Sequence, residues 1–125
     1  TRSDVVTLHV PLMAATRGMM SDREFGLMKK SAILINTCRG PVVDEAALIK
    51  ALNAKEIMAA GLDVLEVEPT PEDNPLIDMD NVSITPHVAS VAQESWKRSR
   101  GFAVQNAIKV ANGGTPQAIV TPERL

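Results

Sequence analysis

The sequence has almost no cysteine, no long apolar run and no excess of charge of either sign, and each lack excludes a class of protein. Its 125 residues include one cysteine, Cys38, which excludes an internal disulfide framework and predicts a reducing, cytoplasmic location. No apolar run approaches the roughly 20 residues of a membrane span. With 13 basic and 15 acidic residues, the net charge of -2 predicts no binding to nucleic acid or to an anionic membrane. No cluster of His, Cys and Asp has metal-ligand spacing, so no metal site is predicted.

Four apolar, strand-like runs are spread along the chain. They occupy residues 5–10, 32–37, 57–64 and 82–85. The second run is continuously apolar until Asn36, which predicts a strand buried on both faces. The runs alternate with helix-like segments, and this order predicts parallel strands joined by right-handed crossovers. The predicted fold class is therefore α/β with a parallel sheet.

Capping residues mark where the helices are expected to begin. Ser21 with Glu24 forms a capping box, and Asp44 is placed to cap a second helix. A long final helix is expected to start at a capping box of Ser90 and Gln93 and to end at Gly113. Between residues 65 and 81 the chain is acidic and proline-rich without helical periodicity, which is typical of a functional or a disordered loop.

Polar residues gather where the predicted strands end. Ligands of open parallel sheets bind beyond the carboxyl ends of the strands. The first strand delivers His9 and Pro11, the second delivers residues 36–40, the third delivers Asp63, Glu66 and Glu68, and the fourth delivers His87. One arginine, one or two carboxylates and one histidine are thus expected at the same edge of the sheet.

Each of these side chains has a chemical use and a plainer alternative. The fork of Arg39 can bind a carboxylate bidentately and polarise a carbonyl, or can make a surface ion pair. His87 can exchange a proton near neutral pH, helped by a carboxylate, or can be a structural histidine before a helix. Asp63 either caps local amides or binds a ligand, and Glu66 and Glu68 are both candidates for pairing with the histidine.

Two further residues are predicted to be structural. His9 lies inside the first strand pattern and is interpreted as a packed strand residue. Cys38 has no base near it in the sequence and is interpreted as a small packing residue rather than a nucleophile.

These residues lie in an ordered series of motifs that resembles the D-isomer-specific 2-hydroxyacid dehydrogenases, which include phosphoglycerate, glyoxylate/hydroxypyruvate and D-lactate dehydrogenases. The matching stretches are SDVV at 3–6, HVPL at 9–12, TRG at 16–18, LINTCRG at 34–40, VVDEAAL at 42–48, GLDV at 61–64, EVEP at 66–69, NV at 81–82 and TPH at 85–87. The likeness covers almost the whole chain at about the family's spacings. The series is therefore far more specific than any one of its motifs.

The resemblance implies an oxidoreductase that transfers hydride between NAD, or alternatively NADP, and a small D-2-hydroxy or 2-keto acid. The family's catalytic arginine, glutamate and histidine fall on Arg39, Glu68 and His87. In the family the histidine protonates the carbonyl oxygen, the glutamate pairs with it, and the arginine holds the substrate's carboxylate. The family's cofactor contacts fall on Val10, Pro11, Thr37, Cys38, Arg39, Asp63, His87, Ala89 and Ser90.

The sequence also departs from the family's pattern. No GxGxxG phosphate turn occurs, and Val88, Ala89 and Ser90 follow the histidine where many members have glycine. The resemblance therefore implies the C-terminal half of a Rossmann-like dinucleotide-binding domain at residues 1–115. Residues 116–125 are expected to form a tail returning toward a separate substrate domain. Two alternatives are a dinucleotide-sensing regulator that recruits partners and an inactive fragment.

If the chain is half of a domain, its association and stability in solution can be predicted. The first strand would lie in the middle of the parent sheet, so in the 125-residue chain alone it would present an unpaired apolar edge. We expect the isolated chain to form a homodimer or larger assembly, or to be poorly stable. Analytical ultracentrifugation with thermal unfolding tests this, and a stable monomer with a cooperative melt would contradict it.

Overall fold

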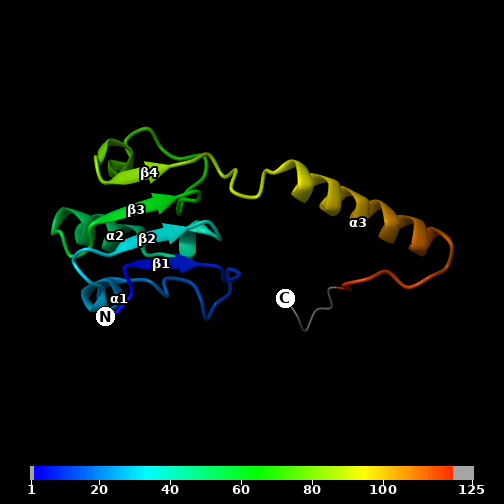
Figure 1. Cartoon of the computed structure of the whole chain (residues 1–125), viewed down its shortest axis with the longest axis horizontal. Coiled ribbons are helices and arrows are strands. Elements are labelled where there is room, and N and C mark those ends of the chain that lie inside the picture. The colour runs from blue at the N-terminus through cyan, green and yellow to red at the C-terminus, as the bar shows by residue number, and fades with distance from the viewer. Residues whose placement is uncertain (1, 120–125) are drawn as a thin grey trace. The chain divides into compact units, whose positions relative to one another are not determined.

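The computed structural model describes residues 2–119, and the chain divides into two units, Thr1–Ala89 and Ser90–Leu125 (Figure 1). The first unit holds the strands β1 (Val5–Leu8), β2 (Ile33–Asn36), β3 (Ala59–Leu62) and β4 (Val82–Ile84). It also holds the helices α1 (Asp22–Leu27) and α2 (Glu45–Asn53) and the 3-10 turns η1 (Gly40–Val42) and η2 (Pro75–Asp78). All strand pairs are parallel, in the order β1-β2-β3-β4, which confirms the predicted parallel α/β fold.

The core lies between one face of this sheet and the two helices. Phe25 of α1, Leu34 of β2 and Leu48 of α2 are almost fully buried in one cluster, and Figure 1 shows α2 behind the sheet. On the opposite face of β2, Ile33 and Ile35 are only half-buried. The prediction of a strand buried on both faces is therefore wrong for this structure, because only one face of β2 is packed closely.

Capping contacts fix where α1 and α2 begin, as predicted. The Glu24 carboxylate accepts a hydrogen bond from the Ser21 amide at 3.3 Å, and Asp44 Oδ1 accepts one from the Ala47 amide at 3.0 Å. Asp44 Oδ2 also accepts a hydrogen bond from the Ser21 hydroxyl at 3.0 Å. The same carboxylate therefore links the starts of the two helices.

The second unit contains the long helix α3 (Gln93–Ala111). Its first helical residue follows Ala92 with no side-chain cap, so the predicted capping box of Ser90 and Gln93 is wrong. The Ser90 carbonyl accepts the Ala92 amide in a turn, which delays the helix. Gly113, with φ +75°, ends the helix as predicted.

No helix among the described residues is long and apolar enough to cross a membrane. Residues 120–125 of the tail predicted at 116–125 lie outside the described residues. The predicted division at residue 115 stays a prediction.

A close backbone approach joins the turn after β2 to the segment after β3. A Cβ atom on Gly40 would lie 1.8 Å from the Leu65 carbonyl oxygen and 2.6 Å from the Glu66 amide nitrogen. No side chain fits in this space, so the two backbones can touch only because residue 40 is glycine.

We expect Gly40→Ala to lower the free energy of unfolding by about 1–3 kcal/mol or more, because the overlapping backbones must separate. Gly26→Ala is the matched control, since Gly26 lies in α1 with nothing within 4 Å of its added Cβ. The control should be neutral or stabilising by up to about 1 kcal/mol. Urea unfolding of both variants tests this, and equal stabilities would contradict it.

Candidate active site

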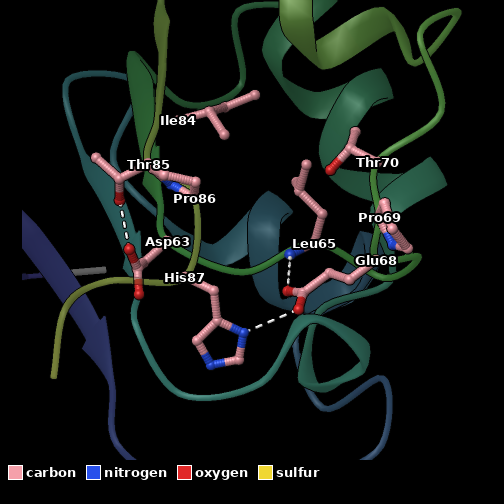
Figure 2. Close-up of a pocket in the computed structure, with 9 residues that line it drawn as sticks. All are labelled: Asp63, Leu65, Glu68, Pro69, Thr70, Ile84, Thr85, Pro86 and His87. Carbon is pink, nitrogen blue, oxygen red and sulfur yellow. Dashed lines mark hydrogen bonds and ion pairs between the residues drawn. The ribbon is translucent and has the colours of Figure 1, made fainter. Parts of the chain in front are cut away.

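The candidate site lies at the edge where the four parallel strands end. Because neighbouring strands point the same way, the residues that follow them emerge on the same side of the sheet. Figure 2 shows part of this edge, where Asp63 follows β3 and Thr85, Pro86 and His87 follow β4. Glu68 reaches the same place from the loop after β3.

The central contact is between Glu68 and His87. Glu68 Oε2 lies 2.8 Å from His87 Nδ1, while Glu68 Oε1 accepts a hydrogen bond from the Leu65 amide at 3.1 Å (Figure 2). With the carboxylate as acceptor, the proton sits on Nδ1, and Nε2 points away from Glu68. The structure thus leaves one imidazole nitrogen available for a proton transfer.

The pKa of Glu68 lies below its ordinary value. The hydrogen bond with His87 is the main cause, and it outweighs the opposing effect of burial. The Leu65 amide and the charges of His87 and Arg39 lower the pKa further.

His87 has a left-handed backbone conformation, with φ +55°. Its amide donates hydrogen bonds to the carbonyl oxygens of Asp63 and Thr85, both at 3.0 Å. A non-glycine residue with positive φ is uncommon and is often found at functional sites. The contacts with Asp63 and Thr85 hold this conformation and direct the ring toward Glu68.

Asp63 organises the turn that carries the histidine. The residue is 4% exposed, and its Oδ1 accepts hydrogen bonds from the Thr85 hydroxyl and the Val88 amide, the latter at 2.9 Å. Oδ2 accepts one from the Ala89 amide at 2.8 Å. Burial raises the pKa of this carboxyl, but these hydrogen bonds and the charge of His87 together bring the pKa below its ordinary value. Asp63 therefore caps local amides, and its binding of a ligand stays a prediction.

The turn after β2 carries Arg39. Asn36, 1% exposed, donates from Nδ2 to the Arg39 carbonyl and accepts the Cys38 amide at Oδ1, both at 3.1 Å. The Arg39 side chain is exposed, and its Nη1 donates to the Cys38 carbonyl at 2.6 Å. Within residues 2–119, Arg39 makes no ion pair with Glu68 or His87. Its charge is still close enough to lower the pKa of Glu68.

Asn36 was expected at this edge of the sheet, but no role was predicted for its side chain. A polar residue ending an otherwise apolar run is the pattern that could have indicated it. The hydrogen bond from the Leu65 amide to Glu68 was also missed, and no side-chain pattern encodes it.

The predicted cofactor-binding residues are placed at or just beyond the strand ends. Val10 is half-buried after β1, Pro11 is exposed, and Thr37 is exposed after β2. Cys38 is half-buried with its Sγ 3.1 Å from Asn36 Oδ1, which agrees with a packing role. Ala89 closes the first unit, and the exposed Ser90 opens the second.

His9, interpreted as a packed strand residue, lies just beyond the end of β1 and is exposed. It hydrogen-bonds to the Thr7 hydroxyl at 3.0 Å. The interpretation of His9 as packed is therefore wrong, because β1 ends at Leu8.

A cavity of about 630 Å³ adjoins the Glu68–His87 pair (Figure 2). Its lining residues are Asp63, Leu65, Glu68, Pro69, Thr70, Ile84, Thr85, Pro86 and His87. A cavity of this size, mostly apolar with a few convergent polar groups, is typical of small-molecule sites. Among the described residues, no group of three or more His, Cys, Asp and Glu side chains is placed to hold a metal ion.

Comparison with known proteins relates this geometry to one family. The sequence profile described as "D-isomer specific 2-hydroxyacid dehydrogenase, NAD binding domain" matches residues 1–89. The chain belongs to this family. The predicted resemblance, the Rossmann-like α/β fold and NAD as the family's cofactor are thereby confirmed.

Curated relatives of this chain are named glyoxylate reductase and glyoxylate/hydroxypyruvate reductase B. The chain is 46% identical over 124 residues to a glyoxylate reductase of Thermofilum pendens, covering 99% of this chain and 37% of that protein. It is 48% identical over 120 residues to glyoxylate/hydroxypyruvate reductase B of an Enterobacter species, covering 96% of this chain and 37% of that protein. The chain thus spans less than two fifths of the length of these relatives.

Solved structures show the same similarity. The D-lactate dehydrogenase of Lactobacillus jensenii with NAD+ superposes with a TM-score of 0.87 at 38% identity, covering 95% of this chain and 40% of that one. A D-isomer specific 2-hydroxyacid dehydrogenase of Xanthobacter autotrophicus in complex with NADPH and MES gives a TM-score of 0.85 at 43% identity. That match covers 98% of this chain and 50% of the solved one.

Lowered carboxylate pKa values predict an acid-sensitive site. The folded pKa values of Asp63 and Glu68 lie below the ordinary values of 3.8 and 4.5, so the unfolded chain binds more protons in acid. Their stabilisation is fully present above those ordinary values and is lost as pH falls through the folded ones. Between neutral pH and about pH 3, we expect the free energy of unfolding to fall less in the Asp63→Asn variant than in the wild type.

Urea unfolding across that pH range measures this dependence. Asp73→Asn, which changes an exposed carboxylate in the loop after β3, is the matched control and should keep the wild-type slope. Identical slopes for Asp63→Asn and the wild type would contradict the prediction.

Proposed function

We propose that the protein containing this chain is an NAD-dependent dehydrogenase that interconverts small D-2-hydroxy acids and 2-keto acids. The observation that carries the proposal is the Glu68–His87 pair, 2.8 Å apart at the carboxyl edge of the sheet. Family membership and the names of the relatives support the reaction class.

His87 is proposed as the acid and base of the reaction. With Nδ1 bonded to Glu68, Nε2 donates a proton to the carbonyl oxygen of a 2-keto acid. In the reverse direction Nε2 accepts the hydroxyl proton of the 2-hydroxy acid. Glu68 keeps the ring oriented and stabilises its charged form, and the Leu65 amide fixes Glu68 in turn.

Arg39 is proposed to bind the substrate's carboxylate. Its guanidinium group is exposed at the same edge, and its planar fork suits a bidentate carboxylate contact. The hydrogen bonds of Asn36 to the Arg39 and Cys38 backbone hold the turn that presents this side chain. A bound carboxylate would then lie beside the position from which His87 donates its proton.

The residues at the strand ends suit one part of a dinucleotide. The residues of the first unit proposed to hold the cofactor follow the ends of β1, β2 and β4, and they are Val10, Pro11, Thr37 and Ala89. The cofactor contact of Ser90, the first residue of the second unit, stays a prediction. NADH, when bound, supplies the hydride for the carbonyl carbon. Asp63 orders the turn after β4 by accepting hydrogen bonds from the Val88 and Ala89 amides. Its contact to the nicotinamide amide stays a prediction.

The remaining expectations concern the chain in solution. The 125-residue chain contains no GxGxxG phosphate turn, so we expect it to have no dehydrogenase activity alone. Self-association through β1, which lies at an edge of the sheet, and a cytoplasmic location stay predictions.

The sharpest test is a pair of histidine variants in the complete protein. We expect His87→Ala to lower kcat by about 10²–10⁴-fold while leaving NADH affinity nearly unchanged, because it removes proton transfer. His9→Ala is the matched control, since this exposed histidine bonds only to Thr7 among the described residues. Steady-state kinetics on a panel of 2-keto acids and NADH titration by fluorescence give both quantities.

Unchanged turnover in His87→Ala would remove His87 from its proposed role. If the complete protein turned over none of the 2-keto acids but bound a partner in an NADH-dependent way, the dinucleotide-sensing alternative would replace the enzyme.

A further inference from the structure

The segment that carries Glu68 is tied at both ends to a single carboxylate. Glu45 is the first residue of α2, and its Oε2 accepts a hydrogen bond from the Glu66 amide at 2.9 Å. Its Oε1 accepts a second hydrogen bond, from Nδ2 of Asn74, at 2.8 Å. Glu68 lies between these two points of attachment.

Both attachments lead to rigid parts of the first unit. α2 is fixed by its buried residues, among them Leu48 at 1% exposed. Asn74 is 8% exposed, and its Oδ1 accepts a hydrogen bond from the amide of Leu76, which is fully buried in the core. Glu45 therefore connects a packed helix to both ends of residues 66–74.

We propose that Glu45 is a positioning residue that sets the place of Glu68 against His87. Glu45 is hydrogen-bonded to neither residue, and it acts by holding the backbone at Glu66 and the side chain at Asn74. The inference rests on the proposed function, because it assigns Glu45 a part in the proton transfer by His87.

The hydrogen-bond chemistry requires a group with two acceptors at position 45. Both partners, the Glu66 amide and Asn74 Nδ2, are donors. A glutamine at position 45 has one acceptor oxygen and one donor nitrogen, so one of the two partners would face another donor. Asn74 cannot turn its amide to help, because its Oδ1 already accepts the Leu76 amide.

Because the donors and acceptors are fixed in this way, a second substitution at position 74 should rescue the Glu45→Gln variant. In the double variant Glu45→Gln with Asn74→Asp, the glutamine oxygen accepts the Glu66 amide and its nitrogen donates to the new carboxylate. That carboxylate can still accept the Leu76 amide, and the total charge equals that of the wild type. The double variant therefore restores all three hydrogen bonds, and donor and acceptor are exchanged only in the contact between residues 45 and 74.

A purely structural role for Glu45 makes a different prediction. An acidic residue in the first turn of α2 also stabilises the helix through its dipole. Loss of that effect lowers stability, but it does not change the pH dependence of turnover, and Asn74→Asp has no means of restoring it.

The experiment uses the complete protein and measures kcat, KM and the pH dependence of keto-acid reduction, together with thermal unfolding. The variants are E45Q, E45Q with N74D, and E68Q as the direct disruption of the pair. Lys50→Gln is the matched control on α2, where Lys50 makes an exposed ion pair with Asp22.

We expect E45Q to lower kcat by about 10- to 100-fold, because misplacement near 1 Å has effects of this size. The alkaline edge of activity should move to lower pH, as in E68Q, because a displaced Glu68 stabilises the charged imidazole less. E45Q with N74D should recover most of kcat and the wild-type pH profile, and Lys50→Gln should change neither.

Wild-type kcat and pH profile in E45Q would overturn the inference, as would a loss that N74D does not rescue. If E45Q does not fold, Asn74→Ala takes its place, because it leaves the contact of Glu45 to Glu66 intact. Asn74→Ala should also lower kcat, by a smaller factor than E45Q, and an unchanged kcat would overturn the inference. Wild-type behaviour of E68Q would instead overturn the proposed function itself.

Discussion

The parallel register of four short strands is the constraint on which the candidate site depends. Each strand is three or four residues long, and the pairing of Leu8 with Asn36, Asn36 with Leu62, and Leu62 with Ile84 aligns their ends. Residues distant in the sequence, such as Arg39 and His87, therefore emerge from one edge. A shift of one residue in this register would turn the side chains at the strand ends to the other face.

Backbone groups then do much of the positioning at that edge. Asp63 binds the Val88 and Ala89 amides, Asn36 binds the turn at Cys38 and Arg39, and the Leu65 amide binds Glu68. Most of these contacts join a side-chain oxygen to an amide, so the acidic residues around the site orient the chain as well as supplying charge. Gly40 adds a steric requirement, since only its missing Cβ lets the turn after β2 approach the segment after β3.

Much of this arrangement could be predicted from the sequence, because it follows from local patterns. Apolar runs indicated four strands, and Asp44 indicated the start of α2. The order of the motifs identified the family.

Two predictions from local patterns were wrong. At Ser90 a turn to Ala92 forms in place of the predicted cap, and in β2 an apolar run is closely packed on only one face. The hydrogen bonds of Asn36 and of the Leu65 amide are local, reaching only two or three residues along the chain, but they depend on turn conformations that the order of residue types does not specify. Placing Arg39, Glu68 and His87 together as a catalytic set still rests on the resemblance.

At position 87, the residue type that best suits the left-handed backbone differs from the residue type that the proposed reaction requires. Glycine would adopt φ +55° with less strain than histidine. If the proposed role of His87 holds, the residue best suited to the backbone has no imidazole, and the residue suited to the reaction strains the backbone. The carbonyl oxygens of Asp63 and Thr85, which accept hydrogen bonds from the His87 amide, then hold the backbone in this strained conformation. A glycine at position 87, chosen to stabilise the protein by relieving that strain, would therefore remove the proposed acid and base.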